Sequence, residues 1–457
     1  MQRVKKTVDM TEGPFFKKML LFAIPIVITG ILQCFYNAAD LVVVGQFRGD
    51  LAVAAVGSTG SLTNLIIGLF MGLSVGAGVC VAHHIGAKEP DEVKKVVHTS
   101  VLLSLICGIV IAVFGFVFSK DLLELMDTPA EVLPLATLYM KIIFFGVPAS
   151  MVYNYVSSMI RSVGDSKRPL IFLAISGVVN VVLNVFLIVV FGMGVDGVAI
   201  ATIVSQYLSA IMSVVYLMKT SGPLKLSFRE LRIDGAKVKK MLHIGIPSGI
   251  QSTLFSLSNV LIQSSINSFG DVVVAGSAAS SSLEGFLYIA MNSMYHVALT
   301  FVGQNVGAKK FKNIKRITAY SAILVVAIGL IGGAILLTFR YPLISLYVTS
   351  NAAMDAAMQR MFIIAGTYFL CGLMDVFCGV LRALDRSVTA MVISLGGACG
   401  LRILWIQTMF RWFPSPQMVY ISYPITWIIT LSFHLIFIIV VSKKLIRRQK
   451  EELVELK

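Results

Sequence analysis

The sequence contains few charged residues. Of its 457 residues, 13% are Asp, Glu, Lys or Arg and 57% are hydrophobic, and the mean hydropathy is +0.86. A soluble globular protein carries about 25% charged residues. We therefore expect most of this chain to face lipid. This excludes an ordinary soluble protein and makes the long apolar runs the guide to its architecture.

Metal, disulfide and catalytic motifs are also lacking. The six Cys lie in apolar segments, and none stands at a metal-ligand spacing from another Cys or a His, so we interpret them as small buried side chains. No nucleophile–base motif or acidic phosphate motif is present, and we expect neither enzyme activity nor a cofactor. Residues 1–18 show no cleavable signal pattern.

Long apolar runs dominate what is present. A helix of about 20 apolar residues crosses a bilayer, and no segment shows the alternating polarity of a barrel strand. Because every backbone polar group in lipid needs a partner, the runs predict an all-α polytopic membrane protein with twelve transmembrane helices. The expected spans are 20–46, 52–82, 97–119, 134–160, 170–191, 197–218, 241–267, 273–303, 317–339, 358–381, 387–410 and 418–442.

The distribution of Lys and Arg predicts the orientation. With a cytoplasmic N-terminus, 31 of the 38 Lys and Arg fall in cytoplasmic segments. Such asymmetry is typical of multi-pass proteins. We expect both termini in the cytoplasm, in a membrane of the bacterial inner-membrane type. The net charge of +15 is then a topology signal, and we expect no nucleic-acid partner.

The chain also repeats itself. The segment KKMLLFAIP at 17–25 matches KKMLHIGIP at 239–247, which lies 222 residues later. HHIGAKEPDEVKKV at 83–96 matches QNVGAKKFKNIKRI at 304–317, at an offset of 221. These matches recur at the same place in a six-helix unit, so they indicate a duplication.

The duplication predicts the domain organisation. We expect an N-terminal six-helix lobe at 1–218, a cytoplasmic linker at 219–240 and a C-terminal six-helix lobe at 241–457. Six is an even number, so both lobes enter the membrane with the same orientation, related by a pseudo-two-fold axis along the membrane normal. Two like lobes suit a transporter that works by alternating access.

Several motifs carry a family resemblance. They are Pro25, Asp40, Gly45 and Gln46 in the first span, GAK at 86–88 and 307–309, RSVGDSKRP at 161–169, and GIPSGIQS at 245–252. In this order and spacing the chain resembles a multidrug and toxic compound extrusion (MATE) transporter, closer to the DinF-like branch than to the NorM-like one. The resemblance implies export of amphipathic, often cationic compounds, driven by inward flow of H+ or Na+.

Asp40 is the residue that most needs an explanation, because a carboxylate at mid-bilayer depth costs about 2.5–3.5 kcal/mol. One interpretation is a buried ion pair with Lys141 or Arg402, although both lie near span ends, where snorkelling is easy. The other is a cation switch: a carboxylate without a fixed counter-ion takes up and releases a proton or Na+ as its surroundings change.

Neutral side chains are the expected partners of such a switch. Asn180 and Asn184 lie one turn apart in the fifth span. In similar transporters these positions, with Thr202, line the ion site with the first-span Asp; Asn37 precedes Asp40 by one turn. Many relatives carry Asp in place of Asn184, and its loss favours H+, or weakly bound Na+. Helix–helix hydrogen bonding is the alternative role of these residues.

The second lobe does not copy this site. The counterpart of Asp40 is Ile262, and Phe255 stands where NorM-like members carry an acid. Glu284 and Asp375 instead form a candidate substrate site or second acid site; pairing with a basic or amide group is the alternative for each. Gln251, Asn259 and Gln33 either line a polar cleft or join helices.

Pro25 and Pro247 occupy matching places in spans one and seven, and each kinks its helix. We expect Asp40 occupancy to bend or straighten span one at Pro25; a static kink is the alternative.

The predicted function is a cation-coupled antiporter that acts as a monomer on small amphipathic compounds in the lipid bilayer. A lipid-linked oligosaccharide flippase of the same superfamily is the alternative, disfavoured by the scarcity of intramembrane Lys and Arg.

Overall fold

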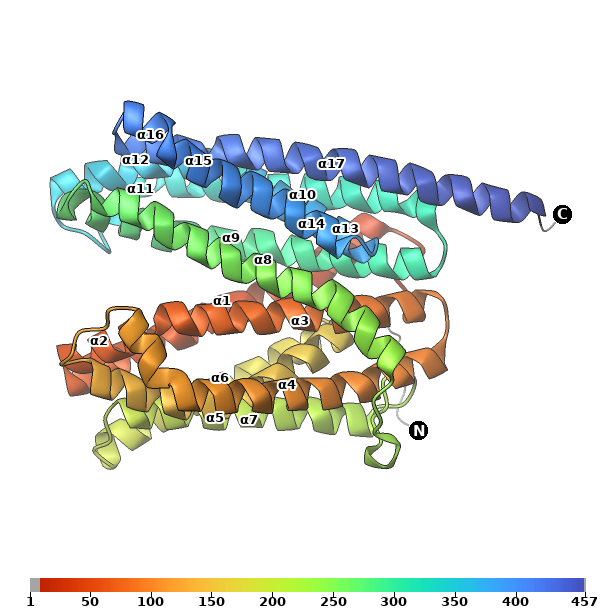
Figure 1. The fold of residues 1–457 in the computed structure, drawn as a ribbon, viewed down its shortest axis with the longest axis horizontal. Coiled ribbons are helices and arrows are strands. Elements are labelled where there is room, and N and C mark those ends of the chain that lie inside the picture. The colour runs from red at the N-terminus through yellow and green to blue at the C-terminus, as the bar shows by residue number, and fades with distance from the viewer. Residues whose placement is uncertain (1–8, 456–457) are drawn as a thin grey trace. The chain divides into compact units, whose positions relative to one another are not determined.

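The computed structural model of the protein describes residues 9–455, which contain helices, turns and loops and no strand (Figure 1). Arg3, Lys5, Lys6 and Lys457, which contribute to the predicted charge asymmetry, lie outside the described residues. The helices of the first half are α1 (Phe15–Arg48), α2 (Asp50–Ser58), α3 (Gly60–Gly86), α4 (Pro90–Leu125), α5 (Leu133–Ser162), α6 (Lys167–Val185), the π-helix η1 (Phe186–Val190) and α7 (Val195–Lys219).

The second half repeats this plan with more interruptions. After the 3-10 helix η2 (Phe228–Glu230) come α8 (Gly235–Asn267), α9 (Asp271–Gly307), α10 (Phe311–Thr338), α11 (Arg340–Ile344), α12 (Asn351–Thr367), α13 (Phe369–Ala383), α14 (Ser387–Ser394), the π-helix η3 (Leu395–Gly400), α15 (Leu401–Gln407), α16 (Met409–Trp412) and α17 (Pro416–Glu455).

Each of the twelve predicted spans coincides with one of these helices or with consecutive helical segments. Ten segments are long and apolar enough to cross a membrane, and α12 with α13, bent by 43°, makes an eleventh. The remaining expected span is α8. Its 33 residues are long enough, but residues 251–267 include ten Ser, Thr, Asn or Gln, which lower its hydropathy.

The chain forms two compact units whose boundaries fall inside helices. Ile28–Gly249 belongs to the first unit, and Asp9–Val27 belongs with the residues from Ile250 onward in the second. The boundary in α1 follows Pro25 by two residues, and the boundary in α8 follows Pro247 by two residues. The linker and the first half of α8 are therefore part of the first unit.

In the first unit, α5 is the central helix and packs against α3, α4 and α7. Glycines let the first half of α8 approach α3 closely: a Cβ on Gly72 would overlap the backbone of Gly249, and one on Gly76 would overlap the carbonyl of Met241. These two glycines are spaced by four residues, as in small-residue packing motifs of membrane helices.

In the second unit, α9 and α13 are central and pack against α10, α12 and α17. The segment before α1 is tied to this unit by side chains of the α9–α10 region. Asn305 Nδ2 donates to the Met10 carbonyl at 2.9 Å, and Asn313 Nδ2 donates to the Thr11 carbonyl at 3.2 Å. Lys310 pairs with Glu12 at 2.5 Å. These bonds help to explain why residues 9–27 belong to the second unit.

Candidate functional site

A close helix crossing positions the first candidate site. Gly177 of α6 lies against the ring of Tyr36 of α1, where a Cβ would overlap the ring carbons. The Tyr36 hydroxyl donates to the carbonyl of Ala174 at 3.4 Å. Asp40 follows Tyr36 by about one turn, and Asn184 follows Gly177 by about two. The crossing therefore brings a carboxylate of α1 to amides of α6.

Asp40 is 9% exposed and is surrounded by neutral hydrogen-bond donors from two helices. Asn184 Nδ2 donates to Asp40 Oδ1, and Thr202 Oγ1 of α7 donates to Asp40 Oδ2 at 3.4 Å. Asn180 Nδ2 donates to Thr202 Oγ1 at 3.4 Å, and Asn184 Nδ2 also contacts Asn180 Oδ1 at 3.3 Å. Four of the predicted residues thus form one network.

The ion-pair interpretation of Asp40 finds no support. Within residues 9–455, Asp40 forms no salt bridge. Lys141 is half-buried, with its ammonium group 5.5 Å from the centre of the Phe116 ring. Arg402 belongs to the second unit and stacks on Tyr423. Among the residues that the structure describes, Asp40 therefore has hydrogen-bond donors but no permanent counter-ion.

Asn37 is not part of this network. Its side chain is exposed, as is that of Gln33 one turn earlier, whereas Asp40 on the same side of α1 is buried. Polar groups exposed at this depth avoid lipid in membrane proteins and face water-filled or protein-lined space. The structure thus separates Asn37 from the residues with which we grouped it.

The network offers oxygen atoms suited to a proton or a small hard cation. The Asn184 Oδ1 atom is buried and has no hydrogen-bond partner among the described residues. A half-turn of this amide would present the oxygen in place of the nitrogen. With Asp40, Asn180 and Thr202 it would supply only oxygen ligands, the type that hard cations prefer. The residues present therefore fit either a proton on Asp40 or a sodium ion.

A π-helical turn follows this site and was not predicted. Directly after Asn184 and Val185, α6 widens into η1, and Arg48 Nη2 at the end of α1 donates to the Ile188 carbonyl within it at 2.8 Å. Single π-helical turns often occur at functional sites. Apolar periodicity does not reveal such a turn. The signal that the sequence did offer was Arg48, a charged residue at the end of the first span.

The acids of the second lobe lie in different surroundings. Glu284 forms a buried ion pair with Arg360, with Nη2 2.9 Å from Oε2 and Nε 3.2 Å from Oε1. Ser280 Oγ donates to Glu284 Oε1 at 2.8 Å, and Arg360 Nη1 donates to Ser277 Oγ at 3.0 Å. The pairing that we considered as the alternative for Glu284 is thus present.

Asp375 differs from Glu284 because it forms no salt bridge within the described residues. It is half-buried, and Asn292 Nδ2 contacts its Oδ2 at 3.5 Å and the Tyr288 hydroxyl at 3.3 Å. Asp375 therefore remains a candidate acid near an exposed aromatic side chain.

The predicted polar-cleft residues divide into two groups. Gln251 is buried and accepts a hydrogen bond from Arg382 Nη2 at 2.9 Å, while Arg382 Nη1 donates to the Tyr295 hydroxyl at 2.6 Å. Gln251 thus joins helices rather than lining open space. Asn259 and Gln33 are exposed, and their role in a polar cleft stays a prediction.

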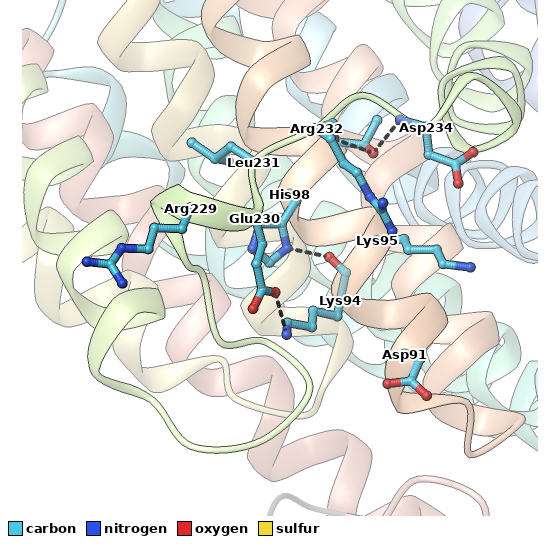
Figure 2. A pocket seen from close by; sticks show the side chains of 10 residues that line it. Asp91, Lys94, Lys95, His98, Arg229, Glu230, Leu231, Arg232 and Asp234 are labelled. Atoms are coloured by element: carbon cyan, nitrogen blue, oxygen red, sulfur yellow. Dashed lines mark hydrogen bonds and ion pairs between the residues drawn. The ribbon is translucent and has the colours of Figure 1, made fainter.

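The inter-lobe linker is held against the start of α4 (Figure 2). Lys94 pairs with Glu230 of the linker, and His98 Nε2 accepts a hydrogen bond from the backbone N–H of Ser227 at 3.1 Å. His98 Nδ1 donates to the Lys94 carbonyl at 2.7 Å. The hydrogen bond and charge of Lys94 lower the pKa of the Glu230 carboxyl. The linker is therefore held against α4 as part of the first unit.

A cavity of about 590 Å³ lies beside these contacts. Charges of both signs line it: Lys95, Arg229 and Arg232 as well as Asp91 and Asp234 (Figure 2). Asp234 Oδ1 accepts hydrogen bonds from the N–H groups of Ala236 and Lys237, so it caps the start of α8. We assign this cavity no ligand, because most of its charges already have partners in the fold.

Comparison with known proteins agrees with this architecture. The MatE family model matches residues 25–186 and 247–406, so its two copies begin at Pro25 and Pro247. The chain is 28% identical over 404 residues to "Probable multidrug resistance protein YoeA" of Bacillus subtilis strain 168, covering 87% of both proteins. It is 23% identical over 400 residues to "Multidrug export protein MepA" of Staphylococcus aureus strain N315, covering 87% of this chain and 88% of that protein.

Solved structures share the fold. One, described as an outward-facing conformation of a multidrug resistance MATE family transporter of the MOP superfamily, superimposes with a TM-score of 0.90 at 20% identity, over 98% of this chain and all of that one. Another, described as MATE in the straight conformation, gives a TM-score of 0.88 at 20% identity, over 98% of this chain and 99% of that one. The predicted all-helical membrane fold and the absence of enzyme activity are confirmed, and the chain belongs to the MatE family of membrane transporters.

Proposed function

We propose that this protein is a cation-coupled antiporter that exports amphipathic, often cationic drugs and toxic compounds. The observation that carries the proposal is the environment of Asp40: a buried carboxylate that receives hydrogen bonds from Asn184 and Thr202 and has no cationic partner within the described chain. Relatives named for multidrug resistance and export support the substrate class.

A carboxylate in this environment can exchange cations. Burial disfavours the charged form of the carboxyl group, whereas hydrogen-bond donors that point at its oxygens favour that form. Movement of the helices changes both effects, and with them the balance between the charged and the neutral form. The coupling cation would bind when the transporter is open to one side of the membrane, and the cationic substrate would bind when it is open to the other side. The role of Asp40 is thus to make the two bindings mutually exclusive.

We infer that the coupling ion is H+, or Na+ bound weakly. Asn184 contacts Asp40 directly, and the family resemblance implies a second acid at this position in many members. One carboxylate supplies one negative charge, which one proton neutralises completely. The unpartnered Oδ1 atom of Asn184 leaves room for sodium as a weaker competitor.

The family motifs and the departures from them suggest the DinF-like branch. The acid lies in the first span at Asp40, and the position at which NorM-like members carry their second-lobe acid is Phe255. This assignment rests on the sequence pattern, and it predicts that the second lobe contributes no cation site of the NorM type.

Alternating access would move the lobe at 1–218 against the lobe at 241–457. Pro25 and Pro247 are buried inside α1 and α8, just before the helix positions at which the compact units meet in sequence. A proline lacks the N–H that would bond the preceding turn, so bending there costs less than elsewhere in a helix. We infer that these two helices flex at their prolines while the linker stays attached to α4.

The flippase alternative requires several free cations to hold a pyrophosphate group. Three arginines are buried in the second unit, although the sequence predicted few intramembrane Lys and Arg. Arg360 is neutralised by Glu284, and Arg382 is bonded to Tyr295 and Gln251. Within residues 9–455 this leaves one of the three buried arginines, Arg402, which has one hydroxyl partner. A pyrophosphate group would need several free cations, so the antiporter is favoured.

Vesicles that contain the full chain provide the test. Efflux of a cationic dye is measured with a pH gradient alone and with a Na+ gradient alone, in the wild type and in Asp40→Asn. We expect the pH gradient to drive export by the wild type and neither gradient to drive it in the variant. Equal gradient-driven export by both proteins would refute the proposal. Cytoplasmic termini and a monomeric state are further expectations, testable by labelling and by mass measurement.

A further inference from the structure

One end of the second unit carries many basic side chains, on the side that the charge distribution predicts to be cytoplasmic. They come from the start of α10 and the last turns of α17. Gln449 Nε2 of α17 donates to the Lys309 carbonyl at 2.7 Å, and Lys309 Nζ lies 3.4 Å from Glu452 Oε2, so these two segments are neighbours. In Figure 1, α17 continues past the connection between α9 and α10. We define the basic surface by the exposed residues Lys312, Lys315, Lys443, Arg447 and Lys450.

The duplication shows that topology alone does not require this surface. Residues 83–96 contain three Lys and three acidic residues, whereas the matching residues 304–317 contain five Lys or Arg and no acid. Lys312 stands in the place of Asp91. Acidic residues contribute little to membrane orientation, and they stabilise the first turn of a helix, where α4 has Asp91 and Glu92. Neither the orientation nor the stability of α10 therefore explains why bases replace acids here.

The basic residues of α17 continue an exposed apolar stripe. Ile436 and Val440 are 54% and 56% exposed and lie four residues apart, on one face of the helix. Lys443, Arg447 and Lys450 follow at steps of three, four and three residues, so they extend that face. An exposed apolar face of a helix that is long enough to cross a membrane meets lipid tails. Side chains that continue the same face therefore lie at the depth of the lipid headgroups.

The start of α10 shows the same change. Lys312 and Lys315 are exposed, and Ala319 and Ile323 follow on the same face, with Ile323 56% exposed. On each helix the change from basic to apolar falls roughly six to ten residues, or 9–15 Å at 1.5 Å per residue, from the hydrogen bond that joins α17 to the α9–α10 connection. The two boundaries thus lie at a similar depth, as expected where both helices leave the same leaflet.

The charges of the basic surface are largely unpaired in the described chain. Its four lysines form no salt bridge with a carboxylate of residues 9–455. Arg447 Nε lies 2.8 Å from Glu451 Oε1, but this pair is exposed, and exposed pairs contribute little. Cations close to an anionic membrane surface attract its headgroups within about one Debye length. The missing counter-charge is therefore one that a bilayer can supply.

We propose that the basic surface binds phospholipids whose headgroups carry a net negative charge, with phosphatidylglycerol as the representative. The phosphate would contact the lysines of the surface, and the acyl chains would lie along the exposed apolar stripes of α10 and α17. A soluble phosphate lacks these chains and fits only part of the surface. This inference does not depend on the export function, because the basic surface shares no residue with the Asp40 network.

Native mass spectrometry of the full chain, released from uncharged detergent micelles, tests this surface. Phosphatidylglycerol and phosphatidylcholine with identical acyl chains are added in equal amounts, and the bound fraction of each is measured. We expect the wild type to prefer phosphatidylglycerol by at least about tenfold, because each basic side chain near an anionic lipid surface contributes roughly a factor of five. The variant Lys443→Gln/Arg447→Gln/Lys450→Gln should lose at least about fivefold of this preference, with phosphatidylcholine binding unchanged.

A control variant and a competitor test where and what the surface binds. The variant Lys88→Gln/Lys225→Gln/Arg229→Gln removes three exposed basic residues of the first unit and should keep the lipid preference. An excess of glycerol 3-phosphate, which has a phosphate but no acyl chains, should not displace phosphatidylglycerol. An equal loss of preference in the control variant would show diffuse attraction, and displacement by glycerol 3-phosphate would show a site for soluble phosphate. Either result would overturn the proposal.

Equal binding of the two lipids by the wild type would also overturn the proposal and leave these residues as determinants of topology. If the triple variant of α17 does not fold, Lys312→Asp decides, because it restores the acid that the first repeat carries at Asp91. It should lower the preference for phosphatidylglycerol at least about fivefold, and an unchanged preference would refute the role of α10. Asp40→Asn should bind both lipids as the wild type does, so the export function and the basic surface can fail separately.

Discussion

Asp40 and Glu284 are both buried carboxylates in long membrane helices, yet their surroundings differ. In the described part of the chain, Asp40 in α1 has two neutral donors and no cationic partner, whereas Glu284 in α9 has the fork of Arg360 and the hydroxyl of Ser280. A fixed counter-ion holds a carboxylate in its charged form, and neutral donors leave it free to exchange. This difference in partners, at two similar acids, is why we propose a coupling role for Asp40 and a structural role for the Glu284 ion pair.

The largest expected effect concerns the acid without a counter-ion. Asp40→Asn should abolish gradient-driven export, by at least about 100-fold, because the amide cannot exchange a proton. Export from vesicles is the measurement. Asp121→Asn removes an exposed acid near the end of α4 and is the matched control. Coupled export that survives in Asp40→Asn would abolish the distinction between the two acids.

The ion pair should show the opposite behaviour. Glu284→Gln leaves Arg360 buried without a counter-charge and should lower stability by about 3–5 kcal/mol. Replacing both residues, Glu284→Leu with Arg360→Met, should recover most of that loss. Unfolding in detergent by denaturant measures both. Asp375→Asn is the control, since Asp375 forms no salt bridge in the described chain, and an effect there as large as in Glu284→Gln would contradict the assignment.

A substitution at the crossing of α1 and α6, which positions Asp40, should have a smaller effect on export. Gly177→Ala places a methyl group in the Tyr36 ring and should cost about 1–3 kcal/mol through overpacking. Export should fall with it, because the crossing sets the distance from Asp40 to Asn184. Gly285→Ala, beside Glu284, meets no atom within 4 Å and is the control. Wild-type export and stability in Gly177→Ala would show that the crossing is not critical.

A single neutral donor should have a modest effect. Thr202→Val removes the 3.4 Å hydrogen bond to Asp40. Interhelical hydrogen bonds in membranes contribute about 0.6 kcal/mol, so we expect a two- to threefold change in the proton concentration that half-saturates export. Thr367→Val, whose hydroxyl bonds its own helix backbone, should leave that concentration unchanged. A shift in the control but not in Thr202→Val would argue against this role.

The smallest effect belongs to a carboxylate outside the membrane. The pKa of Glu230 is lowered by its hydrogen bond with Lys94, so its contribution to stability is present above its ordinary pKa and disappears as the pH falls. Glu230→Gln should lower the unfolding midpoint slightly at pH 7 and not at low pH. Asp91→Asn, in the same cavity, is the control. A difference that grows toward low pH would contradict the pairing.

Local sequence information predicted the helices and part of the site. The spacing of Asn180 and Asn184 placed both amides on one face of α6, and the structure puts them beside Asp40. We grouped Asn37 with them because it lies one turn before Asp40. The two side chains differ in direction by a few tens of degrees around α1, and Asn37 is on the exposed side.

Long-range partners could not be predicted in the same way. Arg360 and Glu284 are 76 residues apart, and their pairing depends on how α9 packs against α12. Arg402 looked like a snorkelling residue because its depth was judged from distance along the span. The π-helical turns η1 and η3 leave apolar periodicity unchanged, yet they alter which side chains face inward.

The most direct measurement is cation release from the purified full chain when a cationic dye binds. Protons are followed with a pH indicator in weakly buffered solution, and Na+ is followed with a radioactive tracer. We predict that the wild type releases about one H+ or one Na+ per dye bound and that Asp40→Asn binds the dye without releasing either. The same release from both proteins would contradict the role of Asp40 as the exchanging acid.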